Sequence, residues 1–121
     1  MFFNNIDIIN KFPFIVDYQT NEDVYHAHYR YYAFWNHPTI TRDEFIEACI
    51  EKEIPIFQGS CSEVYLEKAF EGTASRPENP LKNARDVGNK SLMFLTHPTL
   101  TDDELSEICT NLDNILQSIN G

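Results

Sequence analysis

Residues 34–45 read FWNHPTITRDEF, and residues 94–105 repeat this pattern as FLTHPTLTDDEL. Each copy has the features of a strand end, a turn fixed by proline and a helix start. In both copies a threonine precedes a glutamate by three residues, Thr41 before Glu44 and Thr101 before Glu104. This spacing is the capping box, which satisfies otherwise unpaired amides at a helix start. Such units arise by convergence, so the repeat predicts two strand–turn–helix units and not a gene duplication.

The clearest strand is predicted at residues 24–35, which run into the first copy of the pattern. Successive side chains of a strand point to opposite faces of its sheet. The odd-numbered side chains are all apolar or aromatic and are expected to cover the core: Tyr25, Ala27, Tyr29, Tyr31, Ala33 and Trp35. The even-numbered side chains are mixed and include His26, His28 and Arg30. One covered face and one wetter face favour antiparallel pairing.

Hydrophobic spacing and chain breakers predict the remaining elements. Short extended pieces or strands are expected at residues 14–16, 54–57 and 91–96. Helices are expected at residues 4–12, from Thr41 to before Pro55, from about Ser60 to Phe70, from Asn79 to Gly88, and from Thr101 to Ile119. Their predicted buried side chains include Ile50 in the second helix, Val64 or Tyr65 together with Leu66 in the third, Leu81 and Val87 in the fourth, and Leu112 and Leu116 in the last.

This order of elements predicts an α+β domain of two layers. A small, mainly antiparallel sheet of about three strands is expected to carry its helices on one face. At 121 residues the chain is long enough for one domain with a core of its own. Residues 1–22 are expected to form a lead-in helix and linker, and residues 23–121 the domain itself.

The charge of the chain excludes several classes of partner. A formal net charge of -10 and a sequence pI near 4.6 predict a surface that repels nucleic acid and anionic membranes. No apolar run approaches the roughly 18 residues of a membrane span, and the first residues do not resemble a signal peptide. The cysteines, Cys49, Cys61 and Cys109, are odd in number and irregularly spaced. They predict neither disulfides nor a zinc site, and they fit a reducing, cytoplasmic location.

A few residues carry possible chemistry, and each has a simpler structural interpretation. His26 and His28 share a strand face and could begin a metal site, but no third ligand is signalled, so an interface role is favoured. His37 and His97 precede prolines in the repeated pattern, which suggests a shared local role such as bonding a turn carbonyl. Cys61 would have a lowered thiol pKa if it opened a helix, although no partner base is apparent.

Three segments together resemble a known family. They are HAHYRYYAF at residues 26–34, IPIFQGSCSEVYLEKAF at residues 54–70 and SLMFLTHPTLT at residues 91–101. They are similar to the C-terminal part of the DegT/DnrJ (StrS-like) aminotransferases. These are PLP-dependent enzymes of fold type I, which aminate keto-sugar nucleotides during synthesis of cell-envelope polysaccharides. The resemblance covers about residues 24–118.

The resemblance implies that this chain is the small C-terminal domain of such an enzyme. In the family, a larger N-terminal domain carries the PLP-binding lysine, and nothing in this sequence corresponds to it. We therefore expect no catalytic, cofactor-binding or metal-binding residue in this chain, and no activity from it alone. The expected partners are the missing PLP domain, a sugar nucleotide and a second subunit of a homodimer.

The resemblance also implies a substrate-facing loop after the segment at residues 54–57. It comprises Gln58, Gly59, Ser60, Cys61, Ser62 and Glu63. The even-numbered face of the strand at residues 24–35 would then lie toward the PLP domain. Many family members have a histidine-rich arm here, which this chain lacks, so histidine contacts to the sugar are not expected. An alternative is a stand-alone interaction module, or a truncated paralogue without enzymatic activity.

Overall fold

The computed structural model describes residues 6–17, 21–27, 29–95 and 99–120. Four strands form one antiparallel sheet in the order β1-β2-β4-β3. The strands and helices are α1 (Ile6–Asn10), β1 (Ile15–Asp17), β2 (Arg30–Trp35), α2 (Arg42–Glu51), β3 (Ile56–Gln58), α3 (Lys82–Lys90), β4 (Ser91–Leu95) and α4 (Asp102–Ile119). The α+β class with an antiparallel sheet is confirmed. The sheet has one strand more than expected, because the extended piece before Gln19 pairs with β2 as β1.

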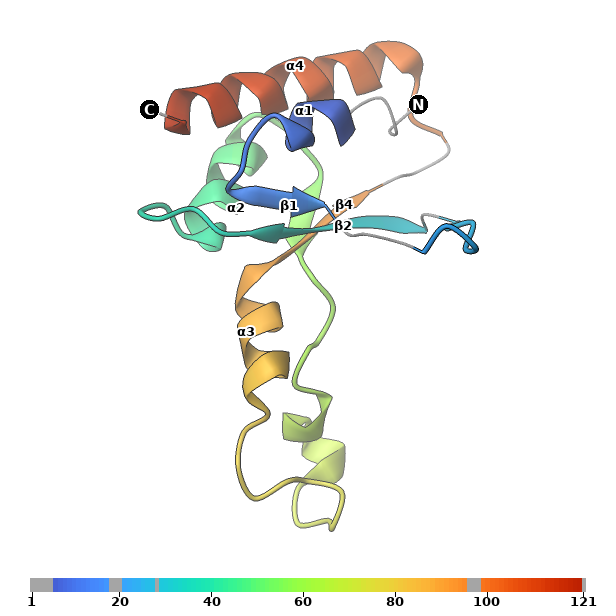
Figure 1. Cartoon of the computed structure of the whole chain (residues 1–121), viewed down its shortest axis with the longest axis vertical. Helices are drawn as coiled ribbons and strands as arrows, with labels where there is room; N and C mark the ends of the chain where they lie inside the picture. Colours follow the sequence, from blue (N-terminus) through green and yellow to red (C-terminus); the bar gives the residue numbers. More distant parts are fainter. Residues whose placement is uncertain (1–5, 18–20, 28, 96–98, 121) are drawn as a thin grey trace.

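The layers divide the molecule into a packed body and a projecting arm (Figure 1). α1 and α4 lie over one face of the sheet, and α2 buries Phe45, Ile46 and Cys49 in the same core. Residues 59–90, here called the arm, extend from the opposite side and include α3 (Figure 1). Helices on one face are thus confirmed for α1, α2 and α4, whereas α3 lies on the other side.

The core lies between the sheet and the three covering helices. The indole ring of Trp35 stacks on Phe45 at 4.2 Å between centroids, which joins β2 to α2. Leu112 and Leu116 of α4 are buried in the same core cluster as Phe94 of β4, and the helical spacing predicts the burial of both leucines. α1 and β1 belong to the same core, since Ile9 and Ile15 are buried in it.

Both capping boxes form as predicted. The Glu44 amide donates to Thr41 Oγ1 at 3.2 Å, and the Thr41 amide donates to Glu44 Oε2 at 2.7 Å. The second box repeats this geometry with 3.2 and 2.8 Å between Thr101 and Glu104. Hydrogen bonds from the threonine backbone and side chain lower the pKa of both carboxyl groups. Each helix direction is therefore set locally, at the end of the proline turn.

The predicted strand at residues 24–35 is correct only in its second half. Tyr31, Ala33 and Trp35 are buried, but Tyr25 and Tyr29 are 98% and 81% exposed, so their predicted place in the core is wrong. Among the described residues, β2 pairs with β4 from Arg30 opposite Leu95 to Phe34 opposite Ser91, and residues 24–27 form no strand. Alternating side chains alone do not make a strand.

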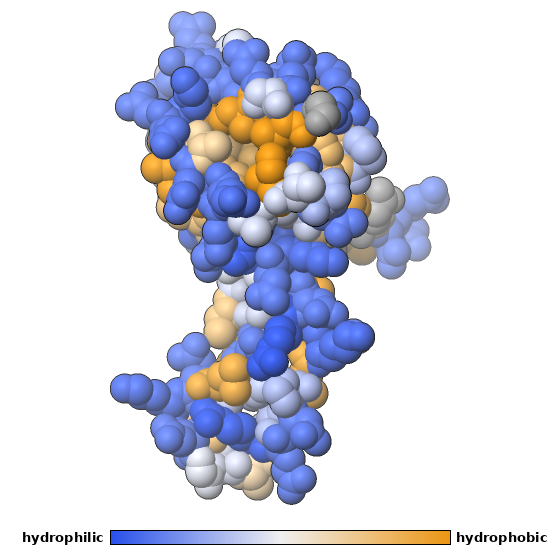
Figure 2. Space-filling model, turned by 90° about the vertical axis from the view of Figure 1, so that its left-hand side faces the viewer, coloured by the Kyte–Doolittle hydropathy of each residue, from blue (hydrophilic) through white to orange (hydrophobic). Residues whose placement is uncertain are grey.

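The helix predicted from Ser60 to Phe70 is also wrong. The segment forms two single 3-10 turns, η2 (Val64–Leu66) and η3 (Lys68–Phe70), with no buried side chain. Val64 and Leu66 are half-exposed, since the arm has no second layer to pack against. Figure 2 shows the arm as mainly hydrophilic with isolated hydrophobic residues. The guanidinium of Arg76 holds the turns by donating to the carbonyls of Tyr65, Leu66 and Glu67.

Two further helix predictions need correction. α3 begins at Lys82 with Leu81 as its N-cap, and it continues through Gly88 to Lys90, where β4 starts directly. Its predicted inward residues Leu81 and Val87 are half-exposed because α3 stands outside the core. In α2, Ile50 is exposed, and the helix ends before Pro55, where Glu53 turns the chain with a positive φ of 57°.

Candidate functional site

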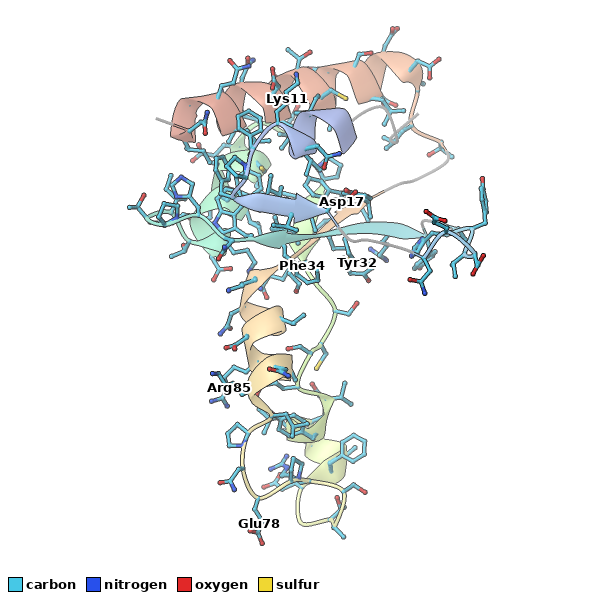
Figure 3. All side chains as sticks on the ribbon, viewed as in Figure 1. Lys11, Asp17, Tyr32, Phe34, Glu78 and Arg85 are labelled. Carbon is cyan, nitrogen blue, oxygen red and sulfur yellow. The ribbon has the colours of Figure 1, made fainter. Side chains whose placement is uncertain are left out.

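A groove of about 420 Å³ lies between β2 and the start of the arm. The side chains of Tyr32 and Phe34 point from β2 toward the arm side of the sheet (Figure 3). The face that α1 and α4 leave uncovered therefore forms the floor of the groove. The lining residues come from three segments of the chain and are His26, Arg30, Tyr31, Tyr32, Phe34, Gly59, Ser60, Ser62, Val87 and Ser91.

The loop after β3 forms one wall of the groove, and its backbone is held against β4. The Gly59 amide donates to the Ser91 carbonyl at 3.2 Å. A Cβ atom on Gly59 would lie 2.1 Å from Ser91 Oγ and 2.6 Å from Ser91 Cβ, so only glycine allows this approach. The hydroxyls of Ser60 and Tyr32 lie 3.0 Å apart within hydrogen-bond distance. The loop is thus fixed to both β4 and β2.

Helix α3 forms the other wall and also depends on a glycine. A Cβ atom on Gly88 would lie 2.0 Å from Ser62 Oγ and 2.9 Å from Ser62 Cβ. Gly88 therefore permits close contact between helix and loop. The prediction that Gly88 ends the helix is wrong. Arg42 of α2 stabilises the junction of α3 and β4, since its Nη1 donates to the Gly88 carbonyl and lies 3.5 Å from the Ser91 carbonyl.

Glu63 organises the arm and does not line the groove. Its Oε1 accepts a 2.7 Å hydrogen bond from the Tyr65 hydroxyl and lies 3.2 Å from Arg85 Nε. The Tyr65 hydroxyl in turn accepts the Leu81 amide at 2.8 Å. Burial and the hydrogen bond to the Glu63 carboxylate raise the pKa of Tyr65. The first turn of α3 is thereby linked to the 3-10 segment on the other side of the arm.

The other two loop residues predicted to face a substrate also bond elsewhere. Gln58 Nε2 donates to Asp43 Oδ1 of α2 at 3.4 Å. The exposed Cys61 thiol donates to Glu67 Oε1 at 3.4 Å, and this hydrogen bond raises its pKa. The hypothesis of a lowered thiol pKa is therefore wrong, because no α-helix starts at Cys61. Within the predicted loop, Gly59, Ser60 and Ser62 reach the groove.

The groove contains residues that the sequence did not connect with the loop. Phe34 and Arg30 were predicted to share the wetter face of a strand, turned toward the PLP domain, and Val87 was predicted to lie in the core. The helix–glycine–strand junction at Gly88 was the available signal, since a glycine inside a helix marks a close approach by another segment. That approach is the contact with Ser62.

The histidines have separate roles. His26 lines the groove, and His37 connects the turn before α2 to the end of α4 by a hydrogen bond of 3.0 Å with the Ile119 carbonyl. The predicted bond to a turn carbonyl is wrong, since this carbonyl ends α4, and the local bonds of His37 are those its Nδ1 accepts from the Thr39 and Ile40 amides. His28 and His97 lie outside the described residues. Within the described part of the chain, no group of three or more His, Cys, Asp or Glu side chains could hold a metal ion.

The residues present do not fit a PLP site. A PLP enzyme needs a lysine inside its cleft to bind the cofactor covalently. All five lysines, Lys11, Lys52, Lys68, Lys82 and Lys90, are exposed, and none lines the groove. The groove instead offers aromatic rings, hydroxyl groups and the side chains of Arg30 and His26. These groups can bind and orient a molecule, but they include no side chain suited to carry the cofactor.

Comparison with known proteins gives the fold its context. No family model and no curated protein matches the chain. An aminotransferase from Psychrobacter cryohalolentis matches 98% of this chain and 34% of its own, with 34% identity and a TM-score of 0.83. The aminotransferase TlmJ from Streptoalloteichus hindustanus matches 98% of this chain and 30% of its own, with 12% identity and a TM-score of 0.76. A DegT DnrJ EryC1 StrS aminotransferase from Brucella abortus matches 98% of this chain and 29% of its own, with 14% identity and a TM-score of 0.70.

These similarities confirm the resemblance seen in the three sequence segments. Each match covers 98% of this chain, and the chain spans only about one third of the length of each aminotransferase. None of the described helices has both the length and the hydrophobicity of a membrane span. The chain therefore has the fold of one part of the DegT/DnrJ-type aminotransferases, consistent with a C-terminal domain.

Proposed function

We propose that this chain is the small domain of a PLP-dependent aminotransferase that acts on keto-sugar nucleotides in cell-envelope polysaccharide synthesis. The observation that supports this proposal is the match of 98% of the chain to 34% of an aminotransferase at 34% identity. The cofactor and its lysine belong to the missing larger domain, and the active form is a cytoplasmic homodimer. Alone, the chain has no aminotransferase activity.

The role of the chain in that enzyme is to cover and orient the substrate. Gly59, Ser60 and Ser62 line the groove and are held by β2, β4 and α3, which supports the proposal that their loop faces the substrate. A fixed wall of this kind excludes water from a reacting group and limits its orientations. Gln58, Cys61 and Glu63 support the loop through bonds to α2 and within the arm.

A chimera tests this function. The chain replaces the matching third of the Psychrobacter aminotransferase, and the visible absorbance of bound PLP and amino transfer from glutamate to a keto-sugar nucleotide are measured. The chimera is expected to bind PLP and to transfer the amino group. The matched control carries Gly59→Val, which displaces the loop from Ser91, and is expected to bind PLP with reduced transfer.

Two results would contradict the proposal. A folded chimera that binds PLP but transfers no amino group, under conditions where the parent enzyme is active, would exclude the substrate-covering role. Bound-PLP absorbance from the 121-residue chain alone would overturn the assignment of the cofactor to the missing domain.

The second candidate is a stand-alone interaction module. It is supported by the half-exposed apolar side chains Val64, Leu66 and Leu81 along the arm. Such a module would form a defined complex with a full-length aminotransferase without changing PLP binding. Co-sedimentation of the two proteins at micromolar concentration tests it, and independent sedimentation would exclude it.

A further inference from the structure

Arg42 lies at a position where a cation does not suit its own helix. It is the first residue of α2, next to the positive end of the helix dipole. The second copy of the repeated pattern has an acid, Asp102, at the same position of α4. Both copies keep the capping threonine before this position and an aspartate and a glutamate after it. The arginine therefore serves a part of the molecule other than the helix that carries it.

The guanidinium of Arg42 reaches the last turn of α3. Its Nη1 donates to the carbonyl of Gly88, which lies 46 residues away in the chain. Carbonyl groups in the last turn of a helix lack partners within the helix, and a nearby cation interacts favourably with the negative end of the dipole. The Arg42 side chain is only 11% exposed, so water competes little for this charge-assisted bond. Arg42 thus caps the end of α3 from the start of α2.

This contact lies where the arm joins the body. The chain enters the arm after Gln58, the last residue of β3, and leaves it at Ser91, the first residue of β4 (Figure 1). Arg42 Nη1 lies 3.5 Å from the Ser91 carbonyl, which also accepts the Gly59 amide at 3.2 Å. Asp43 steadies the guanidinium, since its Oδ1 lies 3.1 Å from Arg42 Nε. One side chain therefore contacts the point at which the two ends of the arm meet.

Two other side-chain bonds support the base of the arm. The Tyr32 hydroxyl lies 3.0 Å from Ser60 Oγ, and Gln58 Nε2 donates to Asp43 Oδ1 at 3.4 Å. Both bonds are exposed and neither includes a cation, so exchange with water leaves them a small net contribution. The bond of Arg42 to α3 is charge-assisted and partly buried. Of these bonds, it is expected to contribute most to the orientation of the arm.

We propose that Arg42 sets the angle between the arm and the sheet, and that it is thereby a positioning residue for the loop of Gly59, Ser60 and Ser62. The angle is a property of this chain by itself. Its consequence for catalysis rests on the proposed function, since a loop that covers a substrate must approach from one direction. If the arm takes that direction only part of the time, the apparent affinity for the substrate falls in proportion.

The angle of the arm is measured on the whole 121-residue chain by amide residual dipolar couplings, which report the direction of each N–H bond. In the parent chain, one alignment tensor is expected to fit the amides of α2, α4, the sheet and α3. Arg42→Asp reproduces the acid of the second copy, and in this variant α3 is expected to need a separate, smaller tensor. α2 and α4 should keep the parent tensor, because an acid suits the first turn of α2.

Three further variants separate the bridging contact from charge and from folding. Arg42→Lys keeps a cation that can reach the Gly88 carbonyl and is expected to keep one tensor. Arg42→Gln removes the charge with less change in shape, and it replaces Arg42→Asp if that variant does not fold. Lys90→Gln is the matched control, since it removes an exposed cation from the last turn of α3 and is expected to leave the couplings unchanged.

The consequence for catalysis is measured in the chimera. Arg42→Asp is expected to raise the KM for the keto-sugar nucleotide about tenfold, which corresponds to a fall of the competent orientation to about one tenth of the population. The kcat should change by less than about twofold, since substrate at saturation restores that orientation. A purely structural role would lower the yield of folded enzyme and leave both constants of the folded fraction unchanged.

The inference is overturned if α3 in Arg42→Asp keeps the parent tensor, or if Lys90→Gln frees the arm to the same extent. Loss of alignment in α2 together with α3, in both Arg42→Asp and Arg42→Gln, would show local unfolding and would also overturn it. A freed arm with an unchanged KM would remove the positioning role in the reaction. An inactive parent chimera would contradict the proposed function alone, and the couplings would still decide whether Arg42 sets the angle.

Discussion

His37 Nε2 lies 3.0 Å from the carbonyl oxygen of Ile119, so the turn before α2 is bonded to the last turn of α4. The other ring nitrogen, Nδ1, accepts the backbone amides of Thr39 at 3.2 Å and Ile40 at 3.0 Å. Since amides only donate, Nδ1 carries no proton in this arrangement, and Nε2 must donate to Ile119. One imidazole ring thus joins the proline turn to the opposite end of the covering layer.

Replacing His37 by alanine is expected to destabilise the fold by about 1–3 kcal/mol, because it leaves two turn amides and one helix carbonyl without this partner. The ring also stacks on Trp35 at 5.8 Å, which adds lost packing to the effect. Urea unfolding measures the change. His26→Ala is the matched control and should unfold like the parent within about 0.5 kcal/mol. Equal stability of the two variants would exclude the bridging role of His37. Detection by ¹⁵N NMR of a proton on Nδ1 of the neutral ring would exclude the assigned tautomer.

The capping boxes give a prediction that depends on pH. The folded pKa of Glu44 and of Glu104 lies below the ordinary value of 4.5, because each carboxylate accepts threonine hydrogen bonds. A carboxyl with a lowered folded pKa binds its proton more readily in the unfolded chain. Its stabilisation is therefore present above pH 4.5 and is lost as the pH falls through the folded pKa.

Glu104→Gln is expected to flatten this acid dependence, since the glutamine keeps the capping shape but does not titrate. Thr101→Ala removes the N-cap itself and is expected to cost about 1 kcal/mol at neutral pH. Thermal unfolding at several pH values between neutrality and pH 3 measures both effects. Glu107→Gln on the same helix is the control, and it should retain the parent's acid dependence. An unchanged slope in Glu104→Gln would contradict the assignment.

Sequence reasoning was accurate where structure is decided locally. The bonds of Thr41 to Glu44 and the burial of Tyr31, Ala33 and Trp35 follow from spacing within a few residues. It failed in the arm, where Val64 and Leu66 have the composition of a packed helix but meet no second layer within the described chain. Burial depends on what covers a segment, and the spacing of apolar residues within that segment does not encode this.

The candidate site was predicted in part for the same reason. Motif similarity pointed to the loop from Gln58 to Glu63, and three of its six residues, Gly59, Ser60 and Ser62, line the groove. That this loop faces a substrate stays a prediction. The opposite wall was missed because Arg42 reaches Gly88 across 46 residues of sequence, a contact that no local pattern encodes. Long-range hydrogen bonds of this kind need the fold before they can be recognised.

The contact between Ser62 and Gly88 predicts that Gly88→Ala lowers stability and that adding Ser62→Gly restores it. Glycine inside a helix normally costs about 0.5–1 kcal/mol relative to alanine. Gly88→Ala should nevertheless destabilise, because its new Cβ would lie 2.9 Å from Ser62 Cβ and 2.0 Å from Ser62 Oγ. The double variant Gly88→Ala with Ser62→Gly removes both clashing atoms and should recover stability. A double-mutant cycle by urea unfolding measures the coupling, and additive effects would exclude the contact.

The cysteines predict a difference in alkylation rate. Hydrogen bonding to Glu67 raises the pKa of the exposed Cys61 thiol, and a raised pKa lowers the fraction of reactive thiolate. Glu67→Gln removes the charged acceptor, so Cys61 should react faster with iodoacetamide at pH 8, by a few-fold. Glu71→Gln is the charge-matched control and should leave the rate unchanged. Burial raises the pKa of Cys49 to about 12, so this thiol should react only after unfolding. Mass spectrometry identifies which cysteine is labelled. An equal Cys61 rate in the parent and in Glu67→Gln would show that the carboxylate does not control this thiol.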